Sequence, residues 1–267
     1  MSCVQPVFTT AEEEGCREGD DETVDNEKGR LQQDQLPETH QLWGDEKDIM
    51  CRFKPPVKPW TPTVYYCYDK EQFWFAGYQL IIQESIEGYA GVVWPAAKAL
   101  CHYMEDNRNE FNLRDKKFLE IGSGTGLVSI VACILGAQVT ATDMPNCLGN
   151  LRYNLSRNTR GKCLHDPKVK ELVWGQDLEL NFPKSSFLYD YIVAADVVYH
   201  HTCLDGLLDT MKHLCQPGTQ LIWANKFRFK SDFDFLLRFN TSFEAELLAE
   251  FPDLEVKIFK AKIRLND

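Results

Sequence analysis

The sequence has no apolar run long enough to cross a membrane, and its ten cysteines include no C-x-x-C pair. The N-terminal residues also lack the apolar core of a secretory signal. These absences argue against a membrane protein, a secreted disulfide-rich protein and a cysteine-rich zinc site. We therefore expect a cytoplasmic protein, with the nucleus as a second location, which has reduced thiols and binds no metal.

Basic residues are outnumbered, with 29 Lys and Arg against 40 Asp and Glu, and the excess of acid lies at one end of the chain. The net charge is −11, and residues 1–50 contain 14 acids and 4 bases, so the other residues are close to neutral. A body without a basic surface is not expected to bind nucleic acid. Residues 1–50 contain too few aliphatic side chains to offset the entropy of ordering, which predicts a disordered acidic tail. Residues 51–95 are expected to form a linker and a small β cap, and residues 96–267 the main domain.

From Lys117 onward, strand-like and helix-like segments alternate, which is typical of a parallel sheet with helices on both faces. Aromatic alternation within residues 65–84 predicts two antiparallel strands that turn at Ala76-Gly77 or just before Gln72. The last two strands have no clear helix between them and predict an antiparallel hairpin at the sheet edge. The predicted strands are 118–121, 138–142, 169–174, 191–195, 220–225, 245–249 and 256–263, and the predicted helices are 96–105, 127–135, 146–158, 203–214 and 232–239.

Residues 118–128 have the form of a strand, a glycine turn and a helix. Gly122, Gly124 and Gly126 alternate in the turn, where glycine permits unusual dihedral angles and a close approach of a ligand. The helix that follows presents free N–H groups at its start. Leu127 occupies the place of the third glycine of the dinucleotide fingerprint, which argues against a nicotinamide-dependent oxidoreductase.

Two acidic residues flank this turn. Glu120 precedes it and is placed to accept hydrogen bonds from loop N–H groups or from a cationic ligand group. Asp143 ends the next predicted strand, where a carboxylate binds the two hydroxyls of a ribose. An adenosine site with no pyrophosphate motif and with an acid for a cationic tail indicates S-adenosylmethionine.

The fourth predicted strand ends in Ala195-Asp-Val-Val-Tyr199. Ligands in open α/β sheets bind beyond the carboxyl ends of the strands, so Asp196 and Tyr199 are candidates to hold and orient an acceptor amine. A carboxylate raises the pKa of a neighbouring amine, so Asp196 is expected to position the amine rather than deprotonate it. The alternative is that Asp196 only caps the next helix. The tip lacks the Asn/Asp-Pro-Pro-aromatic run of enzymes that methylate adenine or glutamine.

Two tryptophans lie at the boundaries of predicted elements. Trp94 precedes the helix that starts near Pro95, and Trp174 ends the third predicted strand of the main sheet. A flat ring at a strand tip suits the face of an adenine, whereas the simple alternative for both residues is packing in the core.

Together, Gly91-Val-Val-Trp-Pro95, the 119–128 glycine stretch, the 135–143 strand, Glu171-Leu-Val-Trp-Gly175 and Ala195–Tyr199 resemble methyltransferase family 16. The match is closest to the protein-lysine methyltransferases of the methyltransferase-like 21 group, in its C or E branch, and it runs from about Phe73 to the C-terminus. The resemblance implies a Rossmann-like seven-strand class I methyltransferase sheet and S-adenosylmethionine as methyl donor. It implies donor-binding roles for Trp94, Gly122, Ser123, Gly124, Asp143, Trp174 and Ala195, and it matches Asp196 and Tyr199 to an Asp-x-x-Tyr signature.

The resemblance also implies a protein partner. Siblings methylate lysines of Hsp70-type chaperones and AAA ATPases, so a folded protein of that kind is the expected substrate. Ala195 and Ser123 stand where other members have serine and alanine, which should leave the backbone contacts intact. Two alternatives stay open: a histidine or small-molecule acceptor, and a donor-binding scaffold without turnover. We expect a monomer, because the substrate must reach the strand tips.

Overall fold

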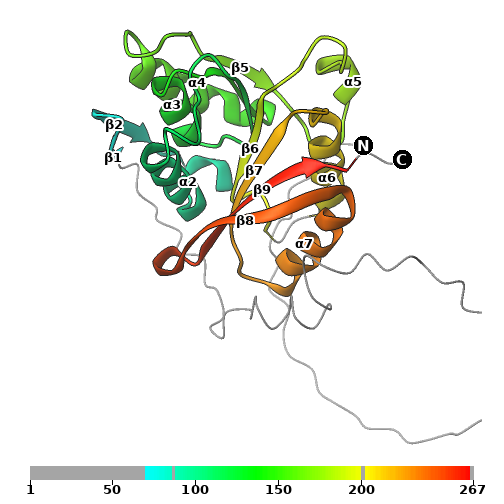
Figure 1. Cartoon of the computed structure of the whole chain (residues 1–267). Helices are drawn as coiled ribbons and strands as arrows, with labels where there is room; N and C mark the ends of the chain where they lie inside the picture. The colour runs from blue at the N-terminus through cyan, green and yellow to red at the C-terminus, as the bar shows by residue number, and fades with distance from the viewer. Residues whose placement is uncertain (1–69, 86–87, 200–201, 265–267) are drawn as a thin grey trace, which may run out of the picture. The chain divides into compact units, whose positions relative to one another are not determined.

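The computed structural model describes residues 70–85, 88–199 and 202–264 (Figure 1). The expected acidic tail and residues 51–69 of the expected linker lie outside the described residues. The strands are β1 Lys70–Phe75, β2 Tyr78–Gln83, β3 Lys117–Ile121, β4 Gln138–Asp143, β5 Lys168–Glu171, β6 Tyr191–Ala195, β7 Gln220–Lys226, β8 Phe243–Phe251 and β9 Val256–Ile263. The α-helices are α2 Pro95–Asp106, α3 Leu127–Ile134, α4 Leu148–Thr159, α5 Leu178–Asn181, α6 Leu204–Leu214 and α7 Lys230–Ser242, and the 3-10 helices are η1 Tyr89–Gly91, η2 Pro145–Cys147 and η3 Pro252–Leu254.

A seven-stranded sheet with the order β5-β4-β3-β6-β7-β9-β8 forms the centre of the fold. Strands β5, β4, β3, β6 and β7 are parallel to one another, whereas β9 is antiparallel to both β7 and β8. Helices α2, α3 and α4 lie on one side of the sheet, and α6 and α7 lie on the other (Figure 1). The prediction of a Rossmann-like sheet with an antiparallel hairpin at its edge is therefore confirmed.

The strand order reverses between β3 and β6. The chain builds outward from β3 through β4 to β5, then returns to the other side of β3 and continues through β6 to β7. Open α/β sheets bind their ligands at this kind of switch point, outside the carboxyl ends of the strands. The glycine turn after β3 and the Asp196 tip after β6 both lie at this position.

The β1–β2 hairpin turns at Ala76-Gly77, which confirms the first of the two predicted turns. Two asparagines on α4, one helical turn apart, attach the β1–β2 hairpin to the main domain. The side chain of Asn158 accepts from Ile81 N (2.9 Å) and donates to Ile81 O (3.0 Å). Asn154 accepts from Gln83 N (2.9 Å) and donates to Gln83 O (3.0 Å), so both amides pair with β2 as a neighbouring strand would.

The third parallel strand ends earlier than predicted. We expected it to reach Trp174, but β5 ends at Glu171, opposite the last residue of β4. Leu172 N makes the final bond to Asp143 O (2.9 Å), and the chain then turns at Gly175, which has a φ of 75°. The turn docks closely on α6, because a Cβ on Gly175 would lie 2.8 Å from Gly206 Cα. Trp174 is therefore held by a turn rather than by strand pairing.

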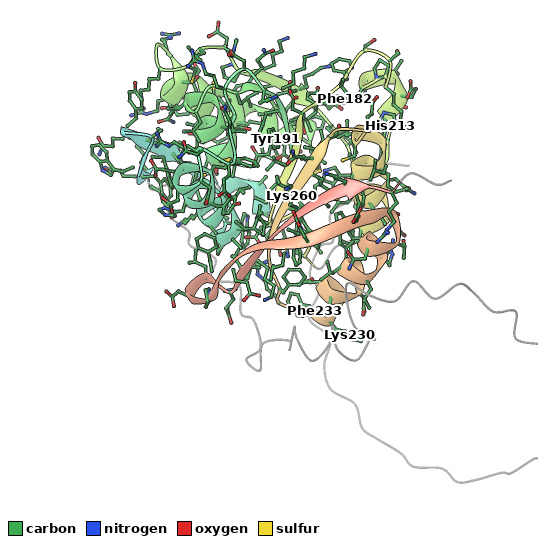
Figure 2. All side chains as sticks on the ribbon, in the orientation of Figure 1. Phe182, Tyr191, His213, Lys230, Phe233 and Lys260 are labelled. Atoms are coloured by element: carbon green, nitrogen blue, oxygen red, sulfur yellow. The ribbon has the colours of Figure 1, made fainter. Side chains whose placement is uncertain are left out.

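Aromatic packing fixes the other half of the sheet. The fully buried Trp223 of β7 contacts the rings of Phe235, Phe239 and Phe259 at centroid distances of 5.2–5.5 Å. On the same side, His213 of α6 is hydrogen-bonded to the carbonyl of Phe182, just after the short helix α5 that the sequence did not predict (2.8 Å; both are labelled in Figure 2). The rings pack β7 against α7 and β9, and β7 pairs in parallel with β6, whose tip carries Asp196.

Candidate active site

The glycine turn after β3 adopts backbone angles that favour glycine. The φ values of Gly122, Gly124 and Gly126 are 68°, 53° and 88°, all in the left-handed region. Ser123 ties the turn to β4, since its N–H donates to Thr142 O (2.9 Å) and its hydroxyl accepts from Thr142 N (3.1 Å). Gly126 caps α3, so the N-terminus of that helix is at the turn. We call residues 122–126 together with Asp143 the glycine cradle.

Asp143 joins the glycine cradle through its carboxylate. One oxygen accepts from Gly124 N (2.7 Å) and the other from Met144 N (2.8 Å). Burial raises the pKa of this carboxyl, and the bonds from these two N–H groups counteract the rise. A carboxylate has about four acceptor positions, so each oxygen can also accept a ligand hydroxyl. The predicted pairing of the glycine turn with Asp143 at one strand edge is therefore present.

Glu120 lies beneath the turn, with 2% of its surface exposed. Its carboxyl accepts a hydrogen bond from the hydroxyl of Ser129 on α3. Burial raises the pKa of Glu120 to about 7, a rise that hydrogen bonds from Ser129 and Ser123 oppose and the charge of Asp143 increases. We expected backbone N–H groups of the loop or a cationic ligand group as partners of Glu120. The hydrogen bonds in the structure come instead from the side chains of Ser129 and Ser123 and from the backbone of Ser129 in α3.

Trp174 borders the glycine cradle although it is not in a strand. A Cβ placed on Gly122 would lie 3.2 Å from a ring carbon of Trp174 and 3.0 Å from a methyl carbon of Val197. The two side chains therefore flank the backbone at Gly122 and restrict that position to glycine. Ala195, at the end of β6, is half-buried and pairs with Ala224 of β7.

Asp196 lies at the tip of β6 and is buried among protein donors. One carboxylate oxygen accepts from Ala96 N at the start of α2 (2.8 Å), and the other accepts from Lys226 N (2.9 Å). The second oxygen also pairs with the guanidinium of Arg228 (3.1 Å), and the two side chains are 1% and 4% exposed. The protein thus fills three of the roughly four acceptor positions of this carboxylate, which leaves about one, on the oxygen bound to Ala96 N.

Tyr199 has other neighbours. Its ring lies 5.5 Å from the ring of Tyr89, and Tyr89 lies 6.1 Å from Trp94. Burial raises the pKa of Tyr199 to about 12, with the charge of Asp143 as the next cause. The loop that carries Tyr199 is fixed by the fully buried Asn225, whose side-chain amide bonds to both N–H and C=O of Val198 (3.1 and 3.0 Å).

The comparisons with known proteins agree with this geometry. A family described as lysine methyltransferase matches residues 75–242. The chain is 52% identical to the cattle (Bos taurus) protein-lysine methyltransferase METTL21E over 72% of this chain and 66% of that protein. It is 38% identical to mouse (Mus musculus) protein N-lysine methyltransferase METTL21A, over 72% of this chain and 87% of that protein. The chain belongs to the lysine methyltransferase family.

The fold also matches a solved methyltransferase. The Thermus thermophilus 16S rRNA N2 G1207 methyltransferase, solved with AdoMet and guanosine, superposes with a TM-score of 0.53 at 18% identity, over 73% of this chain and 50% of that one. S-adenosylmethionine is the donor of this family, which confirms the predicted cofactor. The residues present fit such a ligand, because the Asp143 carboxylate lies at the glycine turn, where it can accept ribose hydroxyls, and the ring of Trp174 lies beside Gly122.

Sequence reasoning did not single out Tyr89, Arg228 or Asn154. Tyr89 lies five residues before Trp94, and this short spacing between aromatic residues beside a predicted helix start was a usable signal. Arg228 follows the tip of β7 by two residues and lies between Lys226 and Lys230, and this group of cations after a strand tip was also a usable signal. Asn154 offered no signal, because its bonds reach residues 29 and 71 positions away.

Among residues 70–264 outside the two gaps, no group of three or more His, Cys, Asp or Glu side chains could hold a metal ion. The helices within these ranges are all too short or too polar to cross a bilayer.

Proposed function

We propose that this protein transfers a methyl group from S-adenosylmethionine to the ε-amine of a lysine in a folded protein substrate. One observation carries the proposal: the glycine cradle and the aromatic residues around Tyr199 meet at the switch point of the sheet of a lysine methyltransferase family member. The named relatives are protein-lysine methyltransferases, which supports a protein acceptor over a small molecule.

We assign the residues that would hold the donor by their chemistry. When bound, S-adenosylmethionine supplies a methyl group on a positively charged sulfur. Asp143 would accept hydrogen bonds from the ribose hydroxyls, and the glycines allow close approach of the adenosine to the backbone. Trp174, half-buried beside Gly122, would cover a face of the adenine.

On the acceptor side, the chain mainly orients the amine and excludes water. A free lysine has a pKa of about 10.4, so it must lose a proton before it attacks. Tyr199 keeps its own proton at neutral pH, because its pKa is raised to about 12. Its hydroxyl would therefore orient the amine rather than act as a base, and the proton would leave to water. Positioning of two reactants lowers the barrier without further catalytic groups.

Asp196 fits a positioning role at this tip. It was predicted to hold the amine, and that contact stays a prediction. Its bonds to Ala96 N and Lys226 N instead support a role in holding the start of α2 against the ends of β6 and β7. That arrangement also fixes the backbone of Trp94, the residue just before α2.

The test is transfer of a radiolabelled methyl group from S-adenosylmethionine into a cell extract. Wild type should label a discrete protein band, and mass spectrometry should place the methyl group on a lysine. Asp143→Ala should lose labelling at a limiting donor concentration and regain part of it at a high one. Asp209→Ala is the matched control, because Asp209 is exposed on α6 and pairs only weakly with Lys212 (3.5 Å). Absence of labelling by a wild-type protein that binds the donor would overturn the proposal.

We further propose a chaperone or AAA ATPase as the substrate, on the resemblance described above. Purified proteins of the two types should be offered separately as acceptors under the same labelling conditions. Labelling of either type at a single lysine supports the assignment. Labelling of another extract protein with neither type modified contradicts it and leaves the lysine transfer itself intact.

A further inference from the structure

Three aromatic side chains gather beside the glycine cradle. Tyr89 lies between Trp94 and Tyr199, with centroid distances of 6.1 and 5.5 Å. We call these three residues the aromatic wall. They come from two distant segments, η1 with the start of α2 and the loop after β6, so only the fold brings them together.

Two contacts fix the wall. The indole N–H of Trp94 donates to the carbonyl of Tyr89 (2.7 Å), which joins the start of η1 to the start of α2. The guanidinium of Arg228 lies 5.5 Å from the Trp94 ring centre, and Arg228 is itself bound to Asp196. One face of Trp94 is therefore already covered by a cation, and Tyr89 is the exposed ring of the wall, whereas Trp94 and Tyr199 are half-buried.

The wall borders the place where the donor would bind. The residue after Tyr89 contacts the glycine cradle, since Ala90 O would lie 3.2 Å from a Cβ on Gly124. At the other end, the charge of Asp143 acts on Tyr199. A group that contacts both tyrosine rings is therefore next to the glycine cradle, where a methyl acceptor must be.

Tyr89 is 55% exposed, so a large part of its ring is open to solvent beside the glycine cradle. The faces of aromatic rings attract cations, and alkylammonium groups are bound in this way. We propose that Tyr89 is an acceptor-binding residue, whose ring and that of Tyr199 receive the ammonium end of the substrate side chain before transfer. This inference rests on the proposed function and adds the residue that selects a cationic side chain.

A binding experiment with small probes tests this inference without knowledge of the substrate. The full-length protein, saturated with S-adenosylhomocysteine, is titrated by NMR with Nα-acetyl-Nε-trimethyllysine methylamide. A second titration uses the neutral isostere, in which a tert-butyl carbon replaces the ammonium nitrogen. Wild type should bind the cationic probe about 2- to 30-fold more tightly than the neutral one.

Substitutions at Tyr89 then locate the effect. Tyr89→Leu should reduce this preference to near unity, and Tyr89→Phe should keep it, because the ring face remains. Tyr153→Leu is the matched control, since Tyr153 is also exposed (48%) but lies on α4 and bonds to Arg157. Equal binding of the two probes by wild type, or an unchanged preference in Tyr89→Leu, would overturn the inference.

The labelling experiment separates failure of this inference from failure of the proposed function. If wild type and Tyr89→Leu label the extract band with equal KM, the protein is a lysine methyltransferase in which Tyr89 does not bind the acceptor. If wild type binds the donor and labels no protein, the proposed function itself fails. Equal thermal unfolding of Tyr89→Leu and wild type would show that the fold is intact.

Discussion

Asn154 and Asn158 provide a sharp test of how the β1–β2 hairpin supports the glycine cradle. Each side chain makes three hydrogen bonds and is at most 2% exposed. Both bind β2 through one acceptor and one donor contact. Their third bonds differ, because Asn154 donates to Thr125 O in the glycine cradle (3.0 Å), whereas Asn158 donates to Asn154 O in its own helix (2.8 Å). The pair therefore separates attachment of the hairpin from support of the cradle.

The magnitudes follow from these bonds. Loss of three buried hydrogen bonds at about 1 kcal/mol each should lower the free energy of unfolding by about 2–4 kcal/mol in either Asn154→Ala or Asn158→Ala. For a folded domain of this size, the melting temperature should fall by about 5–15 °C. Only Asn154→Ala also frees the Thr125 carbonyl, which should weaken binding of S-adenosylmethionine by about five- to tenfold.

The assay is urea unfolding together with calorimetric titration of S-adenosylmethionine, at a temperature where circular dichroism shows that both variants are folded. Equal stability losses with a change of donor affinity in Asn154→Ala alone would support the reasoning. Equal weakening of donor binding in the two variants would refute it, because the effect would then come from the hairpin and not from the bond to the cradle.

Four other predictions follow from buried charges and from the cradle. The pKa of Glu120 is about 7 in the folded protein and about 4.5 in the unfolded chain, so between these pH values the folded protein holds a proton that the unfolded chain has lost. The free energy of unfolding therefore falls by about 3 kcal/mol as the pH rises from 4.5 through 7. Glu120→Gln should therefore gain stability relative to wild type between pH 5 and pH 8 in urea unfolding, and parallel pH curves would contradict this. Arg228→Met should lower the free energy of unfolding by about 3–5 kcal/mol, because it leaves the charge of the buried Asp196 unpaired. Asp196→Ala should abolish methyl transfer, while donor binding measured by calorimetry stays near that of wild type. Gly124→Ala should weaken donor binding at least about tenfold, since its φ of 53° and the close Ala90 carbonyl disfavour a side chain, and unchanged affinity would show that the turn is not the donor site.

The sequence determined the features that depend on local chemistry and on pattern. The mainly apolar runs 118–121 and 191–195 are buried, and they predicted the central strands because such short runs are typical of strands covered on both faces of a parallel sheet. The alternating glycines fixed the turn after β3, and Asp143 at the end of the next strand fixed the pair of residues that would meet there. The same residues carried the resemblance that the family match bears out.

Tertiary structure decided where side chains go once several elements meet. The early end of β5 depends on where β4 stops, so no local pattern placed Trp174 in a turn against Gly122. The partners of Asp196 come from residues 96, 226 and 228, which are 30 to 100 positions away. Likewise, Tyr89 meets Tyr199 only because η1 folds over the glycine turn. Spacing along the chain fixes which residues share one strand or helix, whereas contacts between strand tips depend on the order and register of the whole sheet.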